Sequence, residues 1–237
     1  MVFAAGLGTR LKSETNNKPK ALVEIGGKTL LHHAIEKLKN EGIDEIVVNV
    51  HHFSDKIIAY IKEHNFNIRI HISDESGRLL DTGGGLKKAK HFFTGTDSIL
   101  IYNVDIISNL SLKTLIDCHK DSGALATLAV RNRVTQRYLK FEANKRLVGW
   151  LNKKTGEKKI SVPENFEKGI EKAFSGIHIV QPQIFDLMPE KEIFSIIDLY
   201  LELAKKHLIK GYFDDSNLWM DVGKPDQLQK ARKLFGR

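Results

Sequence analysis

A glycine-rich segment near the amino terminus combines backbone and side-chain groups that could bind phosphate. The segment Ala4-Ala5-Gly6-Leu7-Gly8-Thr9-Arg10-Leu11 is followed at short range by Lys18-Pro19-Lys20-Ala21-Leu22. Glycines allow backbone N–H groups to approach phosphate oxygens closely, because no side chain intervenes. A triphosphate would suit this segment, with Arg10 and Lys20 supplying positive charge. An ordinary glycine-rich turn with surface cations is the alternative, because short glycine patterns are weak evidence.

The residues around these glycines exclude two familiar phosphate-binding loops. Leu11 stands where a dinucleotide-binding fingerprint needs its third glycine. No glycine-lysine-serine/threonine sequence follows at the spacing of a P-loop. The segment therefore predicts a phosphate site of another kind.

Two aspartates could hold a metal ion. Asp105 and Asp221 each follow directly on an apolar run with the character of a strand. Two carboxylates from neighbouring strand ends can hold one Mg²⁺, which prefers oxygen ligands and keeps several positions for phosphate and water. Helix capping or pairing with a lysine is the alternative for either residue. The two lie far apart in the sequence, so their shared strand-end context is what supports a joint site.

Two further segments contain residues small enough to lie against a ligand. Leu80-Asp81-Thr82-Gly83-Gly84-Gly85 would let a base or ribose approach the backbone, with N–H groups at a helix start facing an anion. A tight strand-to-helix turn is its structural alternative. Phe174-Ser175-Gly176 could contact a sugar or simply pack. The pairs His32-His33 and His51-His52 do not indicate a metal site, because adjacent histidines point apart and no HExxH pattern is present.

Composition favours anionic partners of some kind, although a merely solvated basic surface also explains much of the charge. Thirty-seven Lys and Arg against 29 Asp and Glu give a formal charge of +8, but the basic residues are dispersed rather than gathered in a tail or stripe. Small phosphorylated substrates explain this excess as well as nucleic acid does. Cys118 is the single cysteine, so an internal disulfide is excluded, and no apolar run is long enough for a membrane span. We expect a soluble, cytoplasmic protein that binds neither nucleic acid nor membrane.

The elements that must position these residues alternate between strands and helices. Short β-branched runs separated by segments of helical period predict an α/β fold, a mostly parallel sheet with helices on both faces. Ligands of such sheets bind outside the carboxyl ends of the strands, where Asp105 is expected. Strands are expected at residues 1–4, 45–50, 68–72, 98–103, 124–130, 174–180 and 218–221. Helices are expected over Leu30 to Leu38, after Ser54 as a cap, from Gly83, after Ser111, over 194–207 and from Pro225.

The alternation changes at Tyr138. Residues 139–142 and 147–151 are expected to form a hairpin, preceded by Arg137-Tyr138, which could meet a sugar phosphate. The polar stretch Asn152 to Lys172 is expected to be a mobile loop that could close over the sugar. We therefore expect a single domain over residues 1–237, with a hairpin and loop insertion at about 137–173.

Taken together, these segments resemble the bacterial sugar-1-phosphate nucleotidyltransferases, also called nucleoside-diphosphate-sugar pyrophosphorylases. The similarity covers residue 1 to about residue 230 and rests on AAGLGTRL with its downstream PKAL, DTGGG, Asn103-Val104-Asp105, Phe174-Ser175-Gly176-Ile177 and Trp219-Met220-Asp221-Val222-Gly223. The short chain and the TGGG form are most similar to N-acetylmuramate 1-phosphate uridylyltransferase and to the compact mannose-1-phosphate guanylyltransferases. Lys153-Lys154 occupies the region where many relatives have Glu-Lys-Pro, which leaves the sugar open.

The resemblance implies a Rossmann-like nucleotidyltransferase fold with a mixed, mostly parallel central sheet. It implies Arg10 and Lys20 as catalytic cations, and Asp105 and Asp221 as ligands of Mg²⁺. It further implies nucleotide binding by Ala4, Gly6, Gly8, Thr9, Gly83 and Gly84, and sugar binding by Asn103, Ser175 and Gly176.

The implied reaction transfers a nucleoside monophosphate from UTP or GTP to a sugar 1-phosphate and releases pyrophosphate, with UTP slightly favoured. Transfer to a non-sugar phosphate such as phosphocholine is an alternative that would change the Phe174 region. A catalytically inactive regulatory module that binds nucleotide is another, although Arg10, Lys20, Asp105 and Asp221 together argue against it. Nucleic-acid binding is supported by net charge alone.

Overall fold

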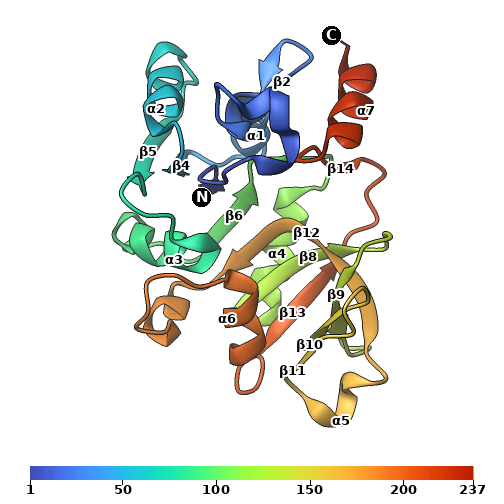
Figure 1. The fold of residues 1–237 in the computed structure, drawn as a ribbon. Coiled ribbons are helices and arrows are strands. Elements are labelled where there is room, and N and C mark those ends of the chain that lie inside the picture. Colours follow the sequence, from blue (N-terminus) through green and yellow to red (C-terminus); the bar gives the residue numbers. More distant parts are fainter. Residues whose placement is uncertain (237) are drawn as a thin grey trace. The chain divides into compact units, whose positions relative to one another are not determined.

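The structure, a computed structural model, describes residues 1–236, apart from the side chains of Lys12 and Ser13. Internal contacts divide the chain into two compact units, whose elements are labelled in Figure 1. Unit 1 consists of Met1–Leu80, Tyr102–Leu112 and the residues from Ser216 onward, and unit 2 consists of Asp81–Ile101 and Lys113–Asp215. Among the described residues, no helix has the length and apolar character that a membrane crossing requires.

The sheet of unit 1 is parallel. β1 (Val2–Phe3) pairs with β4 (Glu45–Val50) on one side and with the last two residues of β6 (Ile99–Asn103) on the other, and β5 (Arg69–Asp74) pairs with β4. Every residue of β4 after Glu45 is buried, as is typical of a strand in a parallel sheet. The expected strand 45–50 is confirmed with the same bounds.

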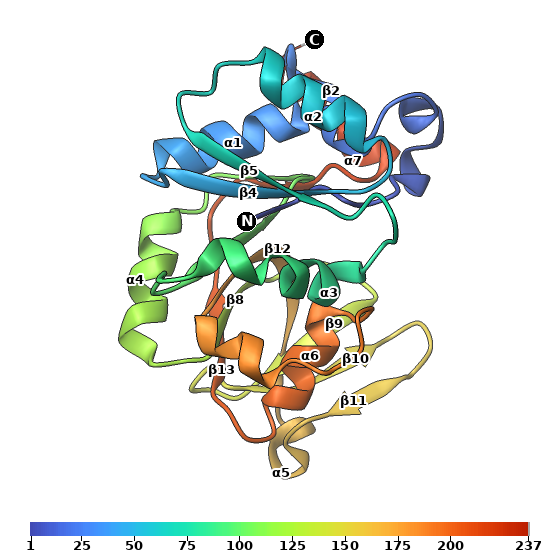
Figure 2. The ribbon, with the colours of Figure 1, turned by 90° about the vertical axis from the view of Figure 1, so that its left-hand side faces the viewer.

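Helices of unit 1 lie over this sheet, and Figure 2 shows α1 and α2 beside β4 and β5. In α1 (Leu30–Asn40) the residues expected on one face, Leu30, Leu31, Ala34, Ile35 and Leu38, are all buried. Its N-cap is Thr29, whose side chain accepts a hydrogen bond from the backbone of His32. The C-terminal helix of the unit is α7 (Pro225–Phe235), which begins at the expected proline.

The start of α2 (Ser54–Glu63) differs from the expectation. Ser54 is the first helical residue rather than the cap, and Phe53 precedes it in the left-handed conformation with φ of 55°. Left-handed backbone is uncommon for an aromatic residue and makes a sharp turn between β4 and the helix.

Short elements of unit 1 surround the glycine-rich segment. The 3₁₀ helices η1 (Thr9–Thr15) and η2 (Lys20–Leu22) follow β1 and lead into the hairpin of β2 (Glu24–Ile25) and β3 (Lys28–Thr29). β7 (Ile106–Ser108), which directly follows Asp105, pairs antiparallel with β14 (Trp219–Asp221). The strand expected at residues 218–221 is found as β14, whereas no strand was expected at β7.

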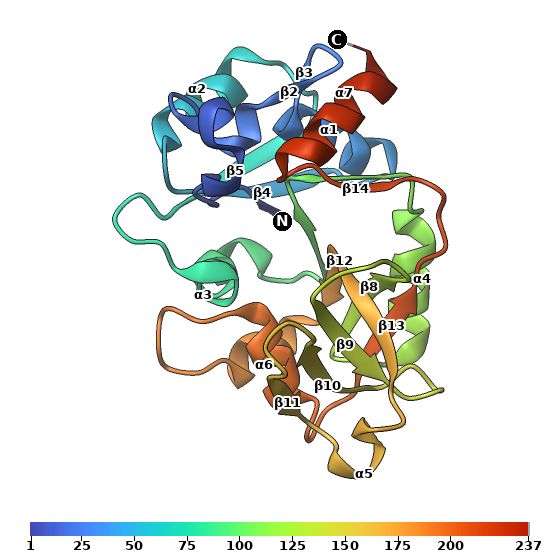
Figure 3. The same ribbon diagram turned by 45° about the vertical axis from the view of Figure 1, so that its right-hand side comes forward.

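Unit 2 has a mixed sheet, seen in Figure 3. β8 (Ala126–Arg131) pairs with β13 (Ile209–Phe213) in parallel and with β12 (Ile170–Val180) antiparallel. β12, β9 (Arg137–Phe141), β10 (Leu147–Asn152) and β11 (Lys158–Ile160) continue as antiparallel neighbours, which confirms the expected hairpin. The other elements are α3 (Asp81–Lys88), η3 (Ala89–Phe93), α4 (Leu112–Ser122), α5 (Pro163–Phe166), η4 (Pro182–Leu187) and α6 (Ile196–Leu203).

Two expectations for unit 2 are wrong. The stretch Asn152 to Lys172 is not an irregular loop, because it contains β11, α5 and the first residues of β12. Val162 and Phe166 anchor it, with exposed fractions of 5% and 1%. The helix expected over 194–207 is limited to α6, where the Ser195 side chain caps the first turn by accepting from the backbone of Ile197.

Candidate active site

The glycine-rich segment of unit 1 leaves the sheet at the end of β1. The backbone N–H of Ala4 donates to Oδ1 of Asn49 over 2.7 Å, so this N–H is already satisfied within the protein. Gly8 has φ of 68°, a left-handed conformation that favours glycine. Its carbonyl accepts from the backbone of Leu11 over 3.0 Å and from the hydroxyl of Thr15 over 3.1 Å. These bonds fix the turn that presents Thr9 and Arg10, both exposed, at its outer side.

A buried polar pair that the sequence analysis missed supports this turn. Asn49 is 3% exposed and Glu75 is 1% exposed. The Asn49 side chain donates to Oε1 of Glu75 over 2.7 Å while it accepts from Ala4. Asn49 was detectable in the sequence as the single polar residue inside the run Ile46-Val47-Val48-Asn49-Val50. Buried polar side chains are generally hydrogen-bonded, and this pair joins β1, β4 and the end of β5.

Lys20 connects the glycine-rich segment to the first aspartate. Its ammonium lies 2.7 Å from Oδ2 of Asp105, and the two side chains are only 14% and 9% exposed. A β-carbon placed on Gly6 would lie 3.8 Å from the same ammonium. The positive charge of Lys20 is therefore held between the predicted phosphate-binding turn and a predicted metal ligand.

The pairing of β7 with β14 brings the two predicted metal ligands together. Asp221 is opposite Ile106, the residue after Asp105, and the backbone of Val222 donates to the Asp105 carbonyl over 2.9 Å. Arg10 approaches the second carboxylate, with Nη1 4.0 Å from Oδ2 of Asp221. The structure thus gathers Arg10, Lys20, Asp105 and Asp221 within unit 1, as two carboxylates faced by two cations.

A buried phenol lies beside this group. Burial and, secondarily, the negative charge of Asp105 raise the pKa of Tyr102 above its ordinary range. Its hydroxyl donates to the carbonyl of Ile106 over 3.0 Å. Tyr102 therefore stays protonated and stabilises the bend between β6 and β7 on which Asp105 lies.

The two carboxylates, Asp105 and Asp221, fit a divalent cation. The described part of the chain contains no cluster of three or more His, Cys, Asp or Glu that could enclose a metal, so protein ligands would come from the carboxylate pair. An oxygen-only donor set that leaves room for water and phosphate is the environment that Mg²⁺ prefers. The ammonium of Lys20 shows that Asp105 already accommodates one positive charge at bonding distance.

Gly83 and Gly84 belong to unit 2 and lie inside α3, which begins at Asp81 rather than at Gly83 as expected. Their backbone N–H groups donate to the carbonyl of Phe194 over 2.9 and 3.3 Å. A β-carbon on Gly83 would lie 2.3 Å from the Phe194 ring. Packing against Phe194 accounts for the missing side chain at position 83, and the role of both glycines in nucleotide binding stays a prediction.

The residues predicted to bind sugar are divided between the units. Asn103 ends β6 in unit 1 and is partly exposed. Ser175 and Gly176 lie in β12 of unit 2, where Ser175 is fully buried and Gly176 has φ of 77°. This left-handed residue coincides with a register shift between Phe174 and His178 in the pairing with β8. The assignment of these residues to the sugar stays a prediction.

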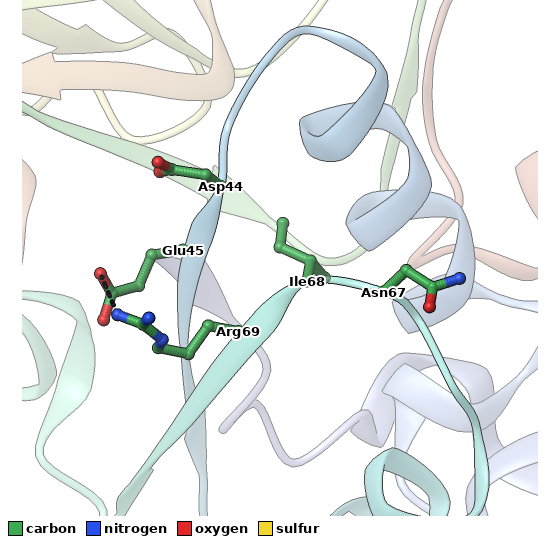
Figure 4. Close-up of a pocket in the computed structure, with 5 residues that line it drawn as sticks. All are labelled: Asp44, Glu45, Asn67, Ile68 and Arg69. Carbon is green, nitrogen blue, oxygen red and sulfur yellow. Dashed lines mark ion pairs between the residues drawn. The ribbon is translucent and has the colours of Figure 1, made fainter.

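A pocket elsewhere in unit 1 lies apart from this group. Asp44, Glu45, Asn67, Ile68 and Arg69 line it, and Figure 4 shows Glu45 and Arg69 facing one another. It is located where β4 and β5 begin, whereas Asn49 and the glycine-rich segment mark the carboxyl ends of the parallel strands. Ligands of parallel sheets bind at the carboxyl ends, which favours the aspartate group as the active site.

Comparison with known proteins identifies relatives over nearly the whole chain. The sequence profile of the family described as Nucleotidyl transferase matches residues 1–235. The N-acetylmuramate alpha-1-phosphate uridylyltransferase of Caulobacter vibrioides is 33% identical over 95% of this chain and 91% of its own length. The UTP–glucose-1-phosphate uridylyltransferase of Synechocystis is 27% identical over 100% of this chain, which spans 63% of that relative.

A solved structure shares the fold. The crystal structure of HddC from Yersinia pseudotuberculosis superimposes with a TM-score of 0.80 at 24% identity, and the match covers 99% of this chain and 98% of that one. The expected Rossmann-like fold with a mixed sheet is confirmed by this similarity and by the strand pairing described above.

Proposed function

Because the chain belongs to the nucleotidyl transferase family, we propose that it transfers a nucleoside monophosphate from UTP or GTP to a sugar 1-phosphate and releases pyrophosphate. The observation that supports this most strongly is the meeting of Arg10, Lys20, Asp105 and Asp221 beside the glycine-rich turn. Relatives named as uridylyltransferases and as guanyltransferases of sugar 1-phosphates support the acceptor. UTP is slightly favoured because the relative matched over 91% of its own length is named as a uridylyltransferase.

Repulsion between two anionic substrates is the first obstacle to this reaction. Arg10 is exposed and Lys20 is held beside Gly6, so both can turn toward a triphosphate bound over the turn. Preorganised cations that face the charge developing on the leaving pyrophosphate lower the barrier. The exposed Thr9 and the open backbone of Gly6 are the groups that would contact the phosphates.

Asp105 and Asp221 are the residues that would hold Mg²⁺. When bound, Mg²⁺ would supply positive charge and orient the phosphate oxygens of the nucleotide. Lys20, whose ammonium pairs with Asp105, would remain beside this site and contribute positive charge toward the triphosphate.

A protein nucleophile is unnecessary in this scheme. The phosphate of a sugar 1-phosphate is already ionised near neutral pH, and its oxygen attacks the α-phosphorus in line with the departing pyrophosphate. Alignment of two bound reactants then lowers the activation free energy by on the order of 7–11 kcal/mol. We assign Asn103, Ser175 and Gly176 to alignment of the sugar, and Gly83 and Gly84 to the base.

We further propose that units 1 and 2 are parts of one catalytic domain in the cytoplasm. The family profile spans both units without interruption.

The test is a pyrophosphate-release assay with Mg²⁺ and each of the four common nucleoside triphosphates against a panel of sugar 1-phosphates. One pair should give turnover far above the rest, and UTP is expected in that pair. Phosphocholine in the same panel tests the non-sugar alternative, and nucleotide binding without any pyrophosphate would indicate a regulatory module. Steeply salt-dependent binding of an oligonucleotide would instead support a nucleic-acid function.

A further inference from the structure

Gly223 lies where the charged groups of the candidate active site converge. A β-carbon built on this residue would be 2.7 Å from Oδ2 of Asp105, 3.0 Å from Oδ1 of Asp221 and 3.1 Å from Nη2 of Arg10. One oxygen of each carboxylate therefore faces the same point in space. The backbone N–H of Gly223 also donates to Oδ1 of Asp221 over 3.1 Å, which holds that carboxylate in place.

The backbone does not explain why residue 223 is a glycine. Its φ lies outside the left-handed region, so an L-amino acid could adopt the same conformation. The helix after it begins only at Pro225, and the atoms that a methyl group would crowd are all ends of side chains. The absence of a side chain at this position leaves free the space between the two carboxylates.

We infer that Gly223 is a positioning residue whose missing side chain keeps open the space in which Asp105 and Asp221 share a divalent cation. This inference rests on the proposed metal-dependent function and adds a residue to it. A methyl group at position 223 would push the Asp105 carboxylate aside, and Asp105 has little freedom to adjust because Lys20 holds the same oxygen at 2.7 Å. Both carboxylates would keep their charges, but the space between them that a cation could occupy would be filled.

The experiment measures Mn²⁺ binding to the nucleotide-free protein by electron paramagnetic resonance, for the wild type, Gly223→Ala and Gly77→Ala. Gly77 is the matched control, because it belongs to the same unit, has no positive φ and has no neighbouring atom within 4 Å of its β-carbon position. Gly223→Ala should weaken Mn²⁺ binding by about tenfold or more, the size of effect that commonly follows when the surroundings that orient metal ligands are disturbed. Thermal unfolding of both variants verifies that each is folded, and wild-type Mn²⁺ affinity in folded Gly223→Ala would overturn the inference.

Asp221→Asn in the same titration separates the inference from the proposed function. If Asp221→Asn binds Mn²⁺ as the wild type does, the carboxylate pair is not the metal site and the proposed chemistry fails with it. If Asp221→Asn loses binding while Gly223→Ala keeps it, the metal site stands and the inference about Gly223 fails alone.

A measurement on the unmodified protein covers the case in which Gly223→Ala does not fold. Mn²⁺ broadens the NMR signals of nearby nuclei, so with ¹⁵N-glycine labelling the amide of Gly223 should disappear at lower Mn²⁺ than the amide of Gly77. Equal broadening of both amides would contradict the inference.

Discussion

Lys20 and Asp105 illustrate how much of the active site depends on single residues. Each is largely buried, and each neutralises the other at 2.7 Å. By contrast, Arg10 is 57% exposed and lies 4.0 Å from its partner Asp221, a distance at which an exposed pair adds little stability. Of the two pairs, the first therefore matters for folding as well as for chemistry, and the second matters mainly for chemistry.

Asp105→Asn and Asp221→Asn should each abolish most turnover, because each removes one negative charge from the proposed metal site. Their effects on stability should differ. Asp105→Asn leaves the largely buried Lys20 without its partner, which can cost a few kcal/mol, while Asp221→Asn should be close to neutral. Urea unfolding together with steady-state kinetics measures both effects. Near-normal activity of either variant with Mg²⁺ would refute the two-carboxylate site.

Arg10→Ala and Lys20→Ala should slow the chemical step more than they weaken binding of the sugar phosphate. Loss of one group that stabilises transition-state charge commonly costs about 10²–10³-fold in kcat. Lys28→Ala and Arg69→Ala are matched controls, since both are surface cations of unit 1 with a glutamate partner. A raised KM for the sugar phosphate with unchanged kcat would assign the two cations to the wrong substrate.

At the level of elements, the sequence predicted best those strands and helices whose own pattern determines them. β4 has a mostly apolar, β-branched run and α1 has an apolar helical face, and both are found as expected. β7 and β11 have three residues each and exist because β14 and β10 supply hydrogen-bond partners from elsewhere in the chain. No local pattern contains that information.

The same limit applies to the active site. Strand-end position was enough to identify Asp105 and Asp221, but their proximity depends on the pairing of β7 with β14. Gly223 was visible only as the residue after Asp221-Val222, and its contact with both carboxylates needs the three-dimensional arrangement. Asn49 is visible in the sequence as a polar residue inside an apolar strand, but its hydrogen-bond partners are known only once Ala4 and Glu75 are placed.

The packing of α3 gives a prediction at this scale. Gly83→Ala should destabilise the protein by about 1–3 kcal/mol, because the added methyl group would overlap the Phe194 ring and its carbonyl. Gly77→Ala, whose new methyl group meets no atom within 4 Å, is the control. Chemical denaturation measures the free energy of unfolding of both variants and so tests this prediction. Equal stability would show that position 83 is a glycine for a reason other than this packing.

For the molecule as a whole, a buried histidine couples stability to pH. His178 of β12 is 1% exposed, and burial lowers its pKa from 6.5 to about 3. The hydroxyl of Tyr200, whose own pKa burial raises, lies 2.6 Å from Nδ1 of this neutral ring. Packing of α6 on β12 therefore favours the neutral form of His178, which carries a proton on only one ring nitrogen.

The unfolded chain takes up a proton on His178 near pH 6.5, whereas the folded protein does so only near 3. The unfolded state binds more protons between these values, so this residue destabilises the fold progressively as the pH falls below 6.5. At about 1.4 kcal/mol per pKa unit, the free energy of unfolding falls by a few kcal/mol over this range. His178→Asn should flatten the pH dependence of the unfolding free energy in this range, while the exposed His91→Asn should not. An unchanged slope in His178→Asn would contradict the assignment.

The central claim is that an oxygen of a sugar 1-phosphate attacks the α-phosphorus of a nucleoside triphosphate. Its most direct test is ³¹P NMR of the protein with Mg²⁺, the triphosphate and the sugar 1-phosphate selected by the pyrophosphate assay, followed as the reaction proceeds. We predict that the sugar phosphate signal declines while pyrophosphate and a pair of mutually coupled diphosphate signals appear in equal amounts. Release of pyrophosphate with a nucleoside monophosphate, and an undiminished sugar phosphate signal, would show that water is the acceptor and would contradict the proposed function.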